Sequence, residues 1–101
     1  MSDQEQDLSR EKMNLETSRI TWKELQRFFA AGKAVSVSLD LDLIDVADQF
    51  ARDNKVLVEQ WMGEGKVGLV ADSQALEWFE EDAEVWAVVV KPWVLVQEVK
   101  P

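Results

Sequence analysis

The hydrophobic positions of the chain follow two spacings, and these predict its helices and strands. The first clear helical spacing ends at Gly32, a residue that readily takes the left-handed conformation that stops a helix. Its apolar members, which share one broad face, are Trp22, Leu25, Phe28 and Phe29.

The start of this helix carries a capping pattern. Thr21 and Glu24 have the spacing of a capping box, in which each side chain accepts a hydrogen bond from a backbone amide of the first turn. A weaker helical spacing comes before it, from Ser9 onward, and includes Met13, Glu16, Thr17 and Ile20. We therefore expect two consecutive helices before residue 32, the second of them capped by Thr21.

The middle of the chain predicts a strand and then a helix. Residues 34–39 alternate between apolar and small polar side chains, which is typical of a short, half-buried strand. The next helix has Leu43, Val46, Ala47 and Phe50 on one face. Asp40 or Asp42 can cap its start, and Asn54 can take the left-handed conformation at its end.

Three further elements follow in the sequence. Residues 55–62 predict a second short helix, residues 66–71 predict a strand, and residues 72–81 predict a helix capped by Asp72 or Ser73. The side chains that we expect this last helix to bury are Leu76 and either Trp78 or Phe79.

The stretch from Asp82 to Gln97 concentrates β-forming apolar residues. Between Val85 and Val90 the odd and the even positions are all apolar, so a strand here needs cover on both faces. Pro92 cannot donate to a β-ladder, so the strand must break, bulge or lie at an edge there. We expect a strand pair or a bent strand that is partly core and partly interface.

A second copy of the chain is the simplest cover for the second face of this strand. The pattern therefore predicts a homodimer, with another protein as the alternative partner. The candidate interface residues are Trp86, Val88, Val90, Trp93 and Leu95. The alternative cover is the helix at residues 73–81, folded back within one chain.

Together these elements predict an α+β fold in a single domain at residues 9–101, after a flexible acidic tail at residues 1–8. The segment from Trp22 to Val70 resembles a winged helix-turn-helix, because a helix, a short strand and a tight helix pair precede a strand that can begin the wing. The resemblance rests on Leu43, Val46, Ala47 and Phe50, followed by Val58, Trp61, Gly65 and Val67. It implies a winged-helix-like domain with an additional helix and a long C-terminal strand or hairpin.

From Leu15 onward the chain also resembles a family of short bacterial proteins known only as a domain of unknown function. The segments that carry this resemblance are LETSRITWKELQRFFAAGKAVSV, LDLIDVADQFARDN, VEQWMGEGKV and WAVVVKPWVLVQ. The resemblance implies a stand-alone cytoplasmic domain. It supplies no activity, no ligand and no catalytic residue.

The amino-acid composition excludes several kinds of catalytic and binding site. The 101 residues include no Cys and no His, which excludes disulfides, thiol catalysis and a Ser-His-Asp triad. The 20 acidic and 11 basic residues give a net charge of −9, which repels phosphate groups, so we expect no specific nucleic acid and no membrane as partner. The first residues lack the apolar core of a signal peptide, so we expect a cytoplasmic location.

The acidic run DLDLIDVAD is the main candidate for a divalent cation site, because Ca²⁺ and Mg²⁺ prefer oxygen ligands. Its carboxylates belong to Asp40, Asp42, Asp45 and Asp48. The run lacks the glycine and the distant glutamate of an EF-hand, and helix capping explains it more simply. We therefore expect no metal, no cofactor and no catalytic residue. The expected function is a non-catalytic protein-interaction or assembly module, and the alternative is a divergent winged-helix transcriptional regulator.

Overall fold

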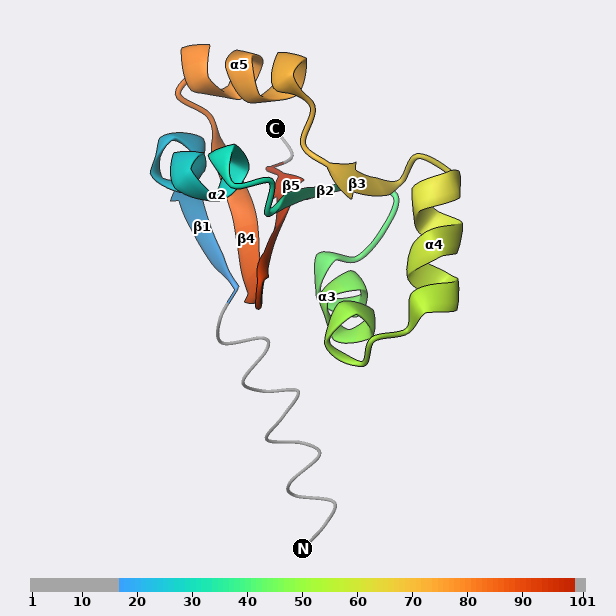
Figure 1. Ribbon diagram of the computed structural model, residues 1–101. Coiled ribbons are helices and arrows are strands. Elements are labelled where there is room, and N and C mark those ends of the chain that lie inside the picture. Colours follow the sequence, from blue (N-terminus) through green and yellow to red (C-terminus); the bar gives the residue numbers. More distant parts are fainter. Residues whose placement is uncertain (1–16, 100–101) are drawn as a thin grey trace, which may run out of the picture.

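A mixed five-stranded β-sheet lies at the centre of the computed structural model, which describes residues 17–99 of the chain (Figure 1). The strands are β1 (Ser18–Thr21), β2 (Ala34–Val37), β3 (Val67–Leu69), β4 (Glu84–Val90) and β5 (Trp93–Glu98). They lie in the order β1-β4-β5-β2-β3, and all neighbours are antiparallel except β5 and β2, which are parallel. The expected tail at residues 1–8 lies outside the described residues.

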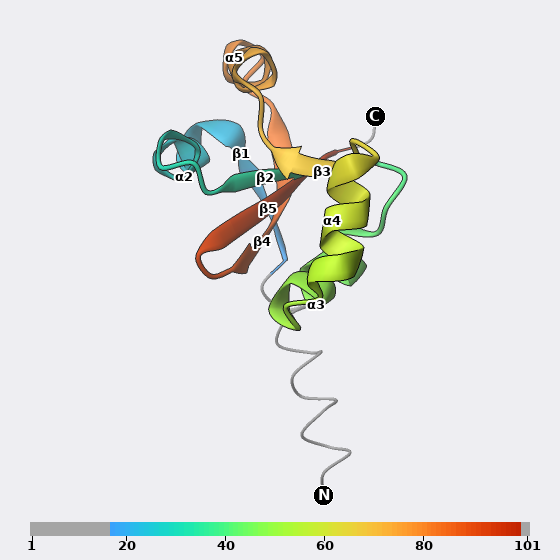
Figure 2. The same ribbon diagram turned by 45° about the vertical axis from the view of Figure 1, so that its right-hand side comes forward.

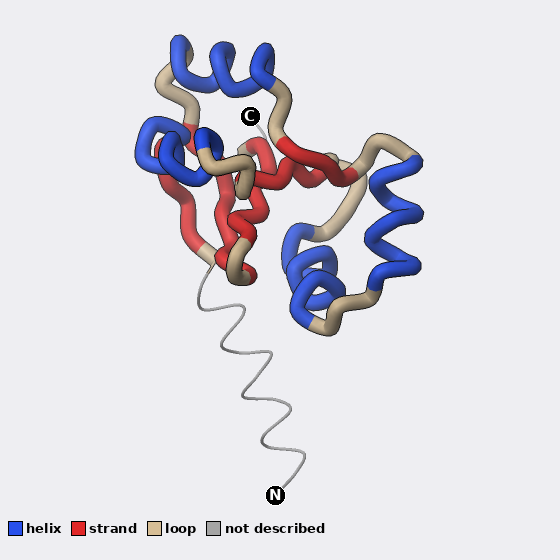
Figure 3. The backbone as a smooth tube through the Cα atoms, viewed as in Figure 1, coloured by secondary structure: helices blue, strands red, loops and turns tan. Residues whose placement is uncertain are grey.

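Helices cover both faces of the sheet (Figures 2 and 3). They are the 3₁₀ helix η1 (Trp22–Leu25), which continues into α2 (Gln26–Ala30), and then α3 (Leu43–Ala51), α4 (Lys55–Gly63) and α5 (Asp72–Glu80). η1, α2 and α5 lie over one face, and α3 and α4 lie over the other. The sheet and its helices confirm the predicted α+β class.

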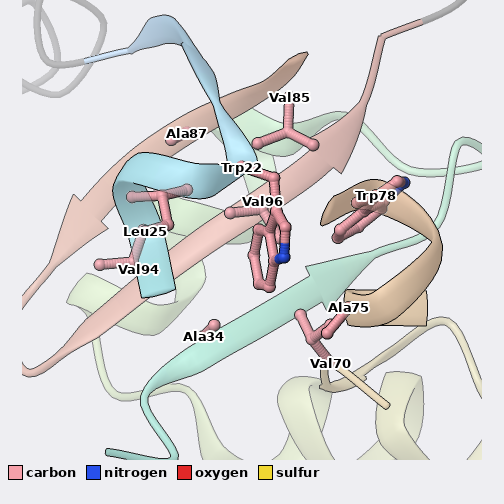
Figure 4. Close-up of a cluster of buried hydrophobic side chains, with 10 residues drawn as sticks. All are labelled: Trp22, Leu25, Ala34, Val70, Ala75, Trp78, Val85, Ala87, Val94 and Val96. Carbon is pink, nitrogen blue, oxygen red and sulfur yellow. The ribbon is translucent and has the colours of Figure 1, made fainter. Parts of the chain in front are cut away.

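The first hydrophobic core lies between the sheet and η1, α2 and α5 (Figure 4). Trp22 is fully buried at its centre and meets Trp78 of α5 edge to face, with the ring centroids 5.1 Å apart. The other buried members are Leu25, Ala34, Val70, Ala75, Val85, Ala87, Val94 and Val96. This core fixes η1 and α5 against the same side of the sheet.

The second hydrophobic core lies between the sheet and α3. Its buried members are Val35, Val37, Leu43, Val46, Ala47, Val67, Val88 and Leu95. Phe50 and Trp61 pack against it and are only partly buried. Helix α3 therefore seals the middle of this face, whereas α4 contributes at its margin.

The apolar C-terminal stretch forms the hairpin of β4 and β5. Its turn holds Lys91 and Pro92, which are joined by a cis peptide bond, and the register next to the turn pairs Val90 with Trp93. The predicted break at Pro92 is confirmed. Val85 faces the first core and Val88 faces the second, so each face of β4 contributes to a core, whereas Trp86 and Val89 of the same strand stay exposed.

The cover of this hairpin comes from the chain's own helices. Helix α5 packs over the first face, as the alternative interpretation expected, and α3 packs over the second. β4 and β5 are also interior strands, because β1 and β2 lie on either side of them. Neither strand of the hairpin therefore forms an edge of the sheet.

The helix expected from Met13 to Ile20 is wrong where the structure describes it. Residues 18–21 form β1, in which Ile20 pairs with Val85. The rest of that expected helix lies outside the described residues. The spacing of a few apolar side chains is ambiguous at this length, and the long-range pairing with β4 decides the outcome.

Thr21 does not cap the first helix. Its hydroxyl group donates to the Oε2 atom of Glu24 at 3.0 Å, and no backbone amide of η1 is bonded to its side chain. The amide of Trp22, the first residue of η1, donates to the carbonyl of Ala83, which directly precedes β4, at 2.9 Å. The predicted capping box is therefore wrong, because the two side chains bond to each other and not to the backbone amides of the first turn.

The caps of the helix pair differ partly from expectation. Asp42 caps α3 as predicted, since its Oδ1 atom accepts from the amides of Ile44 at 2.8 Å and Asp45 at 3.3 Å. The left-handed residue between α3 and α4 is Asp53, with φ of 56°, and not Asn54. Asn54 caps α4 instead, because its Oδ1 atom accepts from the amide of Leu57 at 3.3 Å.

Helix α5 buries Trp78, one of the two expected alternatives, but not Leu76. Ala75 and Trp78 are buried, whereas Leu76 and Phe79 are exposed. The expected cap by Asp72 or Ser73 is also wrong, because Ala71 holds the N-cap position and makes no side-chain hydrogen bond there. Trp78 is thus the large side chain through which α5 packs on the first core.

The winged-helix detail is not confirmed. The helix pair does follow β2 and lead into β3, which pairs with β2. In a wing, however, β3 would pair with the next strand of the chain. Here α5 follows β3, and the next strand, β4, is separated from β3 in the sheet by β5 and β2.

Candidate binding cleft

A cleft of about 350 Å³ opens between the helix pair and the β2–β3 side of the sheet. Sheet residues and Phe50 of α3 supply part of its wall, and α4 supplies the opposite part. The apolar residues that line it are Val35, Phe50, Val58, Met62, Val67, Leu69 and Trp93. A mostly apolar lining and a volume of this order are typical of surfaces that bind apolar groups.

The cleft exists because α4 is packed only at its margin. Across Lys55–Gly63 no residue of the helix is fully buried. The apolar side chains Val56, Leu57 and Val58 are consecutive, so they point in different directions around the helix axis. Only part of this apolar surface can face the sheet, and the remainder lies toward the cleft or the outside.

Two large apolar side chains stand exposed beside the cleft. Met62 of α4 is 52% exposed, and Leu69 of β3 is 60% exposed. We call the cleft together with these two side chains the cleft surface. A soluble domain exposes single apolar residues routinely, but a group around a hollow is typical of a surface that another molecule covers.

The polar rim of the cleft is formed by the start of α4 and the turn before it. Asp53, Lys55 and Glu59 line it, and within residues 17–99 none of the three takes part in an ion pair. Asn54 is occupied, because its amide donates to the Oε1 atom of Gln49 at 2.8 Å while its oxygen caps α4. The rim therefore offers two carboxylates and one ammonium group.

The structure separates the five predicted interface residues. Val88 and Leu95 are fully buried in the second core, so the folded chain leaves them no surface for a partner. Their assignment to an interface is a misassignment of core residues. Trp86 is 38% exposed, and the Arg19 guanidinium lies 6.0 Å from its ring centroid.

The remaining two candidates lie at the hairpin turn. Val90 and Trp93 are partly buried against the second core. Trp93 also lines the cleft, and the Nζ atom of Lys33 lies 5.1 Å from its ring centroid. Of the predicted interface residues, Trp93 is thus the one that the fold brings to the cleft.

The acidic run before and within α3 is used locally. Asp42 caps the helix, and the Oδ2 atom of Asp48 pairs with the Nε atom of Arg52 at 2.9 Å. In the described part of the chain, no three carboxylates form a group that could hold a metal ion. None of the helices in residues 17–99 has the length and apolar content needed to cross a bilayer.

The sequence pattern predicts the helix at residues 55–62 but not the cleft beside it. The fold leaves Val58 and Met62 of this helix beside a hollow. A signal was present in the three consecutive apolar residues from Val56 to Val58, since a nine-residue helix against a sheet cannot bury all three. The exposure of Leu69 follows from its place on the edge strand β3.

The architecture is that of a small α+β protein, with a mixed five-stranded sheet between two helical layers and an apolar cleft on one side. The sequence model of the family described as "Protein of unknown function (DUF2288)" matches residues 8–98, so the chain belongs to this family.

A similar solved structure is the NMR solution structure of PA1075 from Pseudomonas aeruginosa. It is 41% identical in sequence, covers 89% of this chain and 83% of its own, and superimposes with a TM-score of 0.81. Comparison with curated proteins finds no match. The resemblance to a family of unknown function is thereby confirmed.

Proposed function

We propose that the protein is a non-catalytic protein-interaction module, and that its cleft surface holds apolar side chains of another polypeptide chain. The observation that carries the proposal is the pair of exposed side chains, Met62 and Leu69, beside an apolar hollow. Protein interfaces have an apolar centre and a polar rim, and the polar residues Asp53, Lys55 and Glu59 line the α4 side of this hollow.

The chemistry of the cleft supports docking of side chains. Met62 has an unbranched, flexible thioether side chain that adapts to the shape of a partner. Trp93 presents an aromatic surface, and aromatic residues are enriched in interfaces. We further propose a cytoplasmic setting, with which a sequence free of Cys agrees.

The alternative function, a winged-helix regulator, has less support. Helix α4 follows α3 as a recognition helix would, but Lys55 is its single basic residue. The net charge of −9 adds repulsion from the phosphate backbone. A basic stripe, which a DNA-binding surface requires, has no counterpart on this helix.

Affinity capture with matched variants tests the proposal. The tagged protein would be incubated with extract of its native cell and with a differently tagged copy of itself, and the captured polypeptides would be identified by mass spectrometry. The Leu69→Asn variant is expected not to capture a polypeptide that the wild type captures. Leu76→Asn is the control, because Leu76 is 58% exposed but lies on α5, away from the cleft.

The comparison of the two leucine variants decides the result. Loss of a captured polypeptide with Leu69→Asn alone supports an interaction through the cleft surface. Equal capture by the wild type and both variants would contradict it. Circular dichroism of each variant checks that the fold is retained.

A further inference from the structure

Helix α4 has an uncovered outer face. Val56 is 79% exposed, the largest exposure among the exposed large apolar residues of the described chain. It lies next to Lys55 and Glu59, which are four residues apart and therefore share one side of the helix. The outer face thus continues from the cleft surface around the helix, with apolar residues flanking two opposite charges.

Charge makes this face unusual on an acidic protein. The nine residues of α4 contain one Lys and one Glu, so the helix has no net side-chain charge, whereas the whole chain carries −9. Two copies of a strongly acidic chain repel each other least where their surfaces are neutral. Helix α4 provides such a surface together with exposed apolar groups.

The two charges are also complementary to their own copy. If two α4 helices pair antiparallel about a two-fold axis, Lys55 of one copy faces Glu59 of the other, and the symmetry repeats the contact. In a two-fold dimer every contact occurs twice, once in each direction. A surface that pairs with its own copy must therefore be complementary to itself, as Lys55 and Glu59 are. Opposite charges in this arrangement favour the pair over other partners.

Gly63 at the end of α4 is a separate observation. A Cβ atom at Gly63 would meet no atom within 4 Å, and its φ is not in the left-handed region. Neither the packing of the described chain nor its backbone therefore requires glycine here, although glycine weakens a helix relative to alanine. A missing side chain at this position allows another backbone to approach closely.

We propose that the polypeptide that covers the cleft surface is a second copy of this chain, docked through antiparallel pairing of the two α4 helices. The inference rests on the proposed function and names its partner. Closed two-fold dimers are the commonest oligomers, and stable interfaces bury about 800 Å² on each partner. With Lys55 opposite Glu59, the two α4 helices overlap along residues 55–59. Met62, Gly63 and Leu69 then lie at the margin of the interface, toward the end of α3 of the other copy.

Sedimentation and light scattering of the full chain, over a range from low to high micromolar concentration, test the pairing. The wild type is expected to rise from the monomer mass toward twice that mass. Glu59→Lys places Lys opposite Lys in the pair and is expected to raise the dimer dissociation constant about tenfold or more. The double variant with Lys55→Glu and Glu59→Lys restores opposite charges and is expected to recover most of the affinity.

Two further variants separate pairing from folding. Glu80→Lys makes the same charge change on α5 and is expected to leave the dimer unchanged. Gly63→Gln fills open space in the single chain, so we expect it to keep or raise thermal stability while weakening the dimer. A variant that has lost its fold would show a weaker helical circular dichroism signal. The double variant is expected to keep the wild-type signal.

The outcomes distinguish this inference from the proposed function. A wild type that remains monomeric up to high micromolar concentration overturns the α4 pairing, and so does a dimer that Glu59→Lys leaves intact. In both cases the proposed function stands if the wild type captures a different polypeptide that the Leu69→Asn variant does not capture. If Leu69→Asn loses none, the proposed function is overturned as well.

Discussion

The Nε2 atom of Gln97 donates hydrogen bonds to the carbonyl of Leu41 at 2.7 Å and to the carbonyl of Ser38 at 2.9 Å. Gln97 belongs to β5, whereas both carbonyls belong to the loop between β2 and α3. One amide thus fixes the connection that leads the chain from the sheet into the helix pair.

Gln97→Leu is expected to lower the free energy of unfolding by about 1–3 kcal/mol, because two partly buried carbonyls lose their donor. Urea denaturation followed by Trp fluorescence measures the change. Gln74→Leu on α5 serves as the control and is expected to stay within about 0.5 kcal/mol of wild type. Equal effects of the two substitutions would contradict a role for this contact.

Asp42→Ala is expected to cost about 1 kcal/mol, because Asp42 accepts hydrogen bonds from two amides at the start of α3. Thr21→Ala is expected to cost less, since the Thr21 hydroxyl bonds to Glu24 and not to a helix amide. Asp40→Ala is a charge-matched control for Asp42→Ala. A larger loss of stability in Thr21→Ala than in Asp42→Ala would contradict the assignment of Asp42 as the cap of α3 and of Thr21 as a residue that caps no helix.

Trp78→Phe is expected to cost much less than Trp78→Ala, for which the loss is about 3–5 kcal/mol. The ring of Trp78 fills space against Trp22, but within the described residues its buried indole N–H has no hydrogen-bond partner. Phenylalanine keeps an aromatic contact and removes the unpaired donor. Thermal unfolding of both variants tests this, and similar losses would mean that the indole shape itself is required.

The chain is expected not to bind duplex DNA in a sequence-dependent manner. Its net charge is −9, and α4 has a single base, Lys55, at the position of a recognition helix. A mobility assay at physiological salt measures the affinity. Specific binding at micromolar concentration or tighter would reject this prediction and favour the regulator.

The sequence predicted those elements whose apolar residues all face one core. Helix α3 has Leu43, Val46 and Ala47 at helical spacing, and all three are buried. The turn at Pro92 was predictable because proline cannot take part in the ladder. Both signals are local, so the sequence alone determines them.

The incorrect predictions concern residues whose structure depends on contacts with residues far away in the sequence. Ile20 has a helical spacing with earlier residues, but its pairing with Val85 places it in β1. Val88 and Leu95 were expected at an interface because the number of covering helices was unknown. The cleft was missed for a related reason, since the packing of Met62 depends on how closely α4 approaches the sheet.

The position of β5 has a consequence for how the chain folds during synthesis. β5 lies between β4 and β2, so it is the strand that joins the β1–β4 pair to the β2–β3 pair. It also follows the other four strands in the chain. A ribosome therefore releases β1, β2 and β3 before the strand that unites them exists. Until β5 arrives, the edges of β4 and β2 that it will pair with remain open to chaperones and to neighbouring nascent chains.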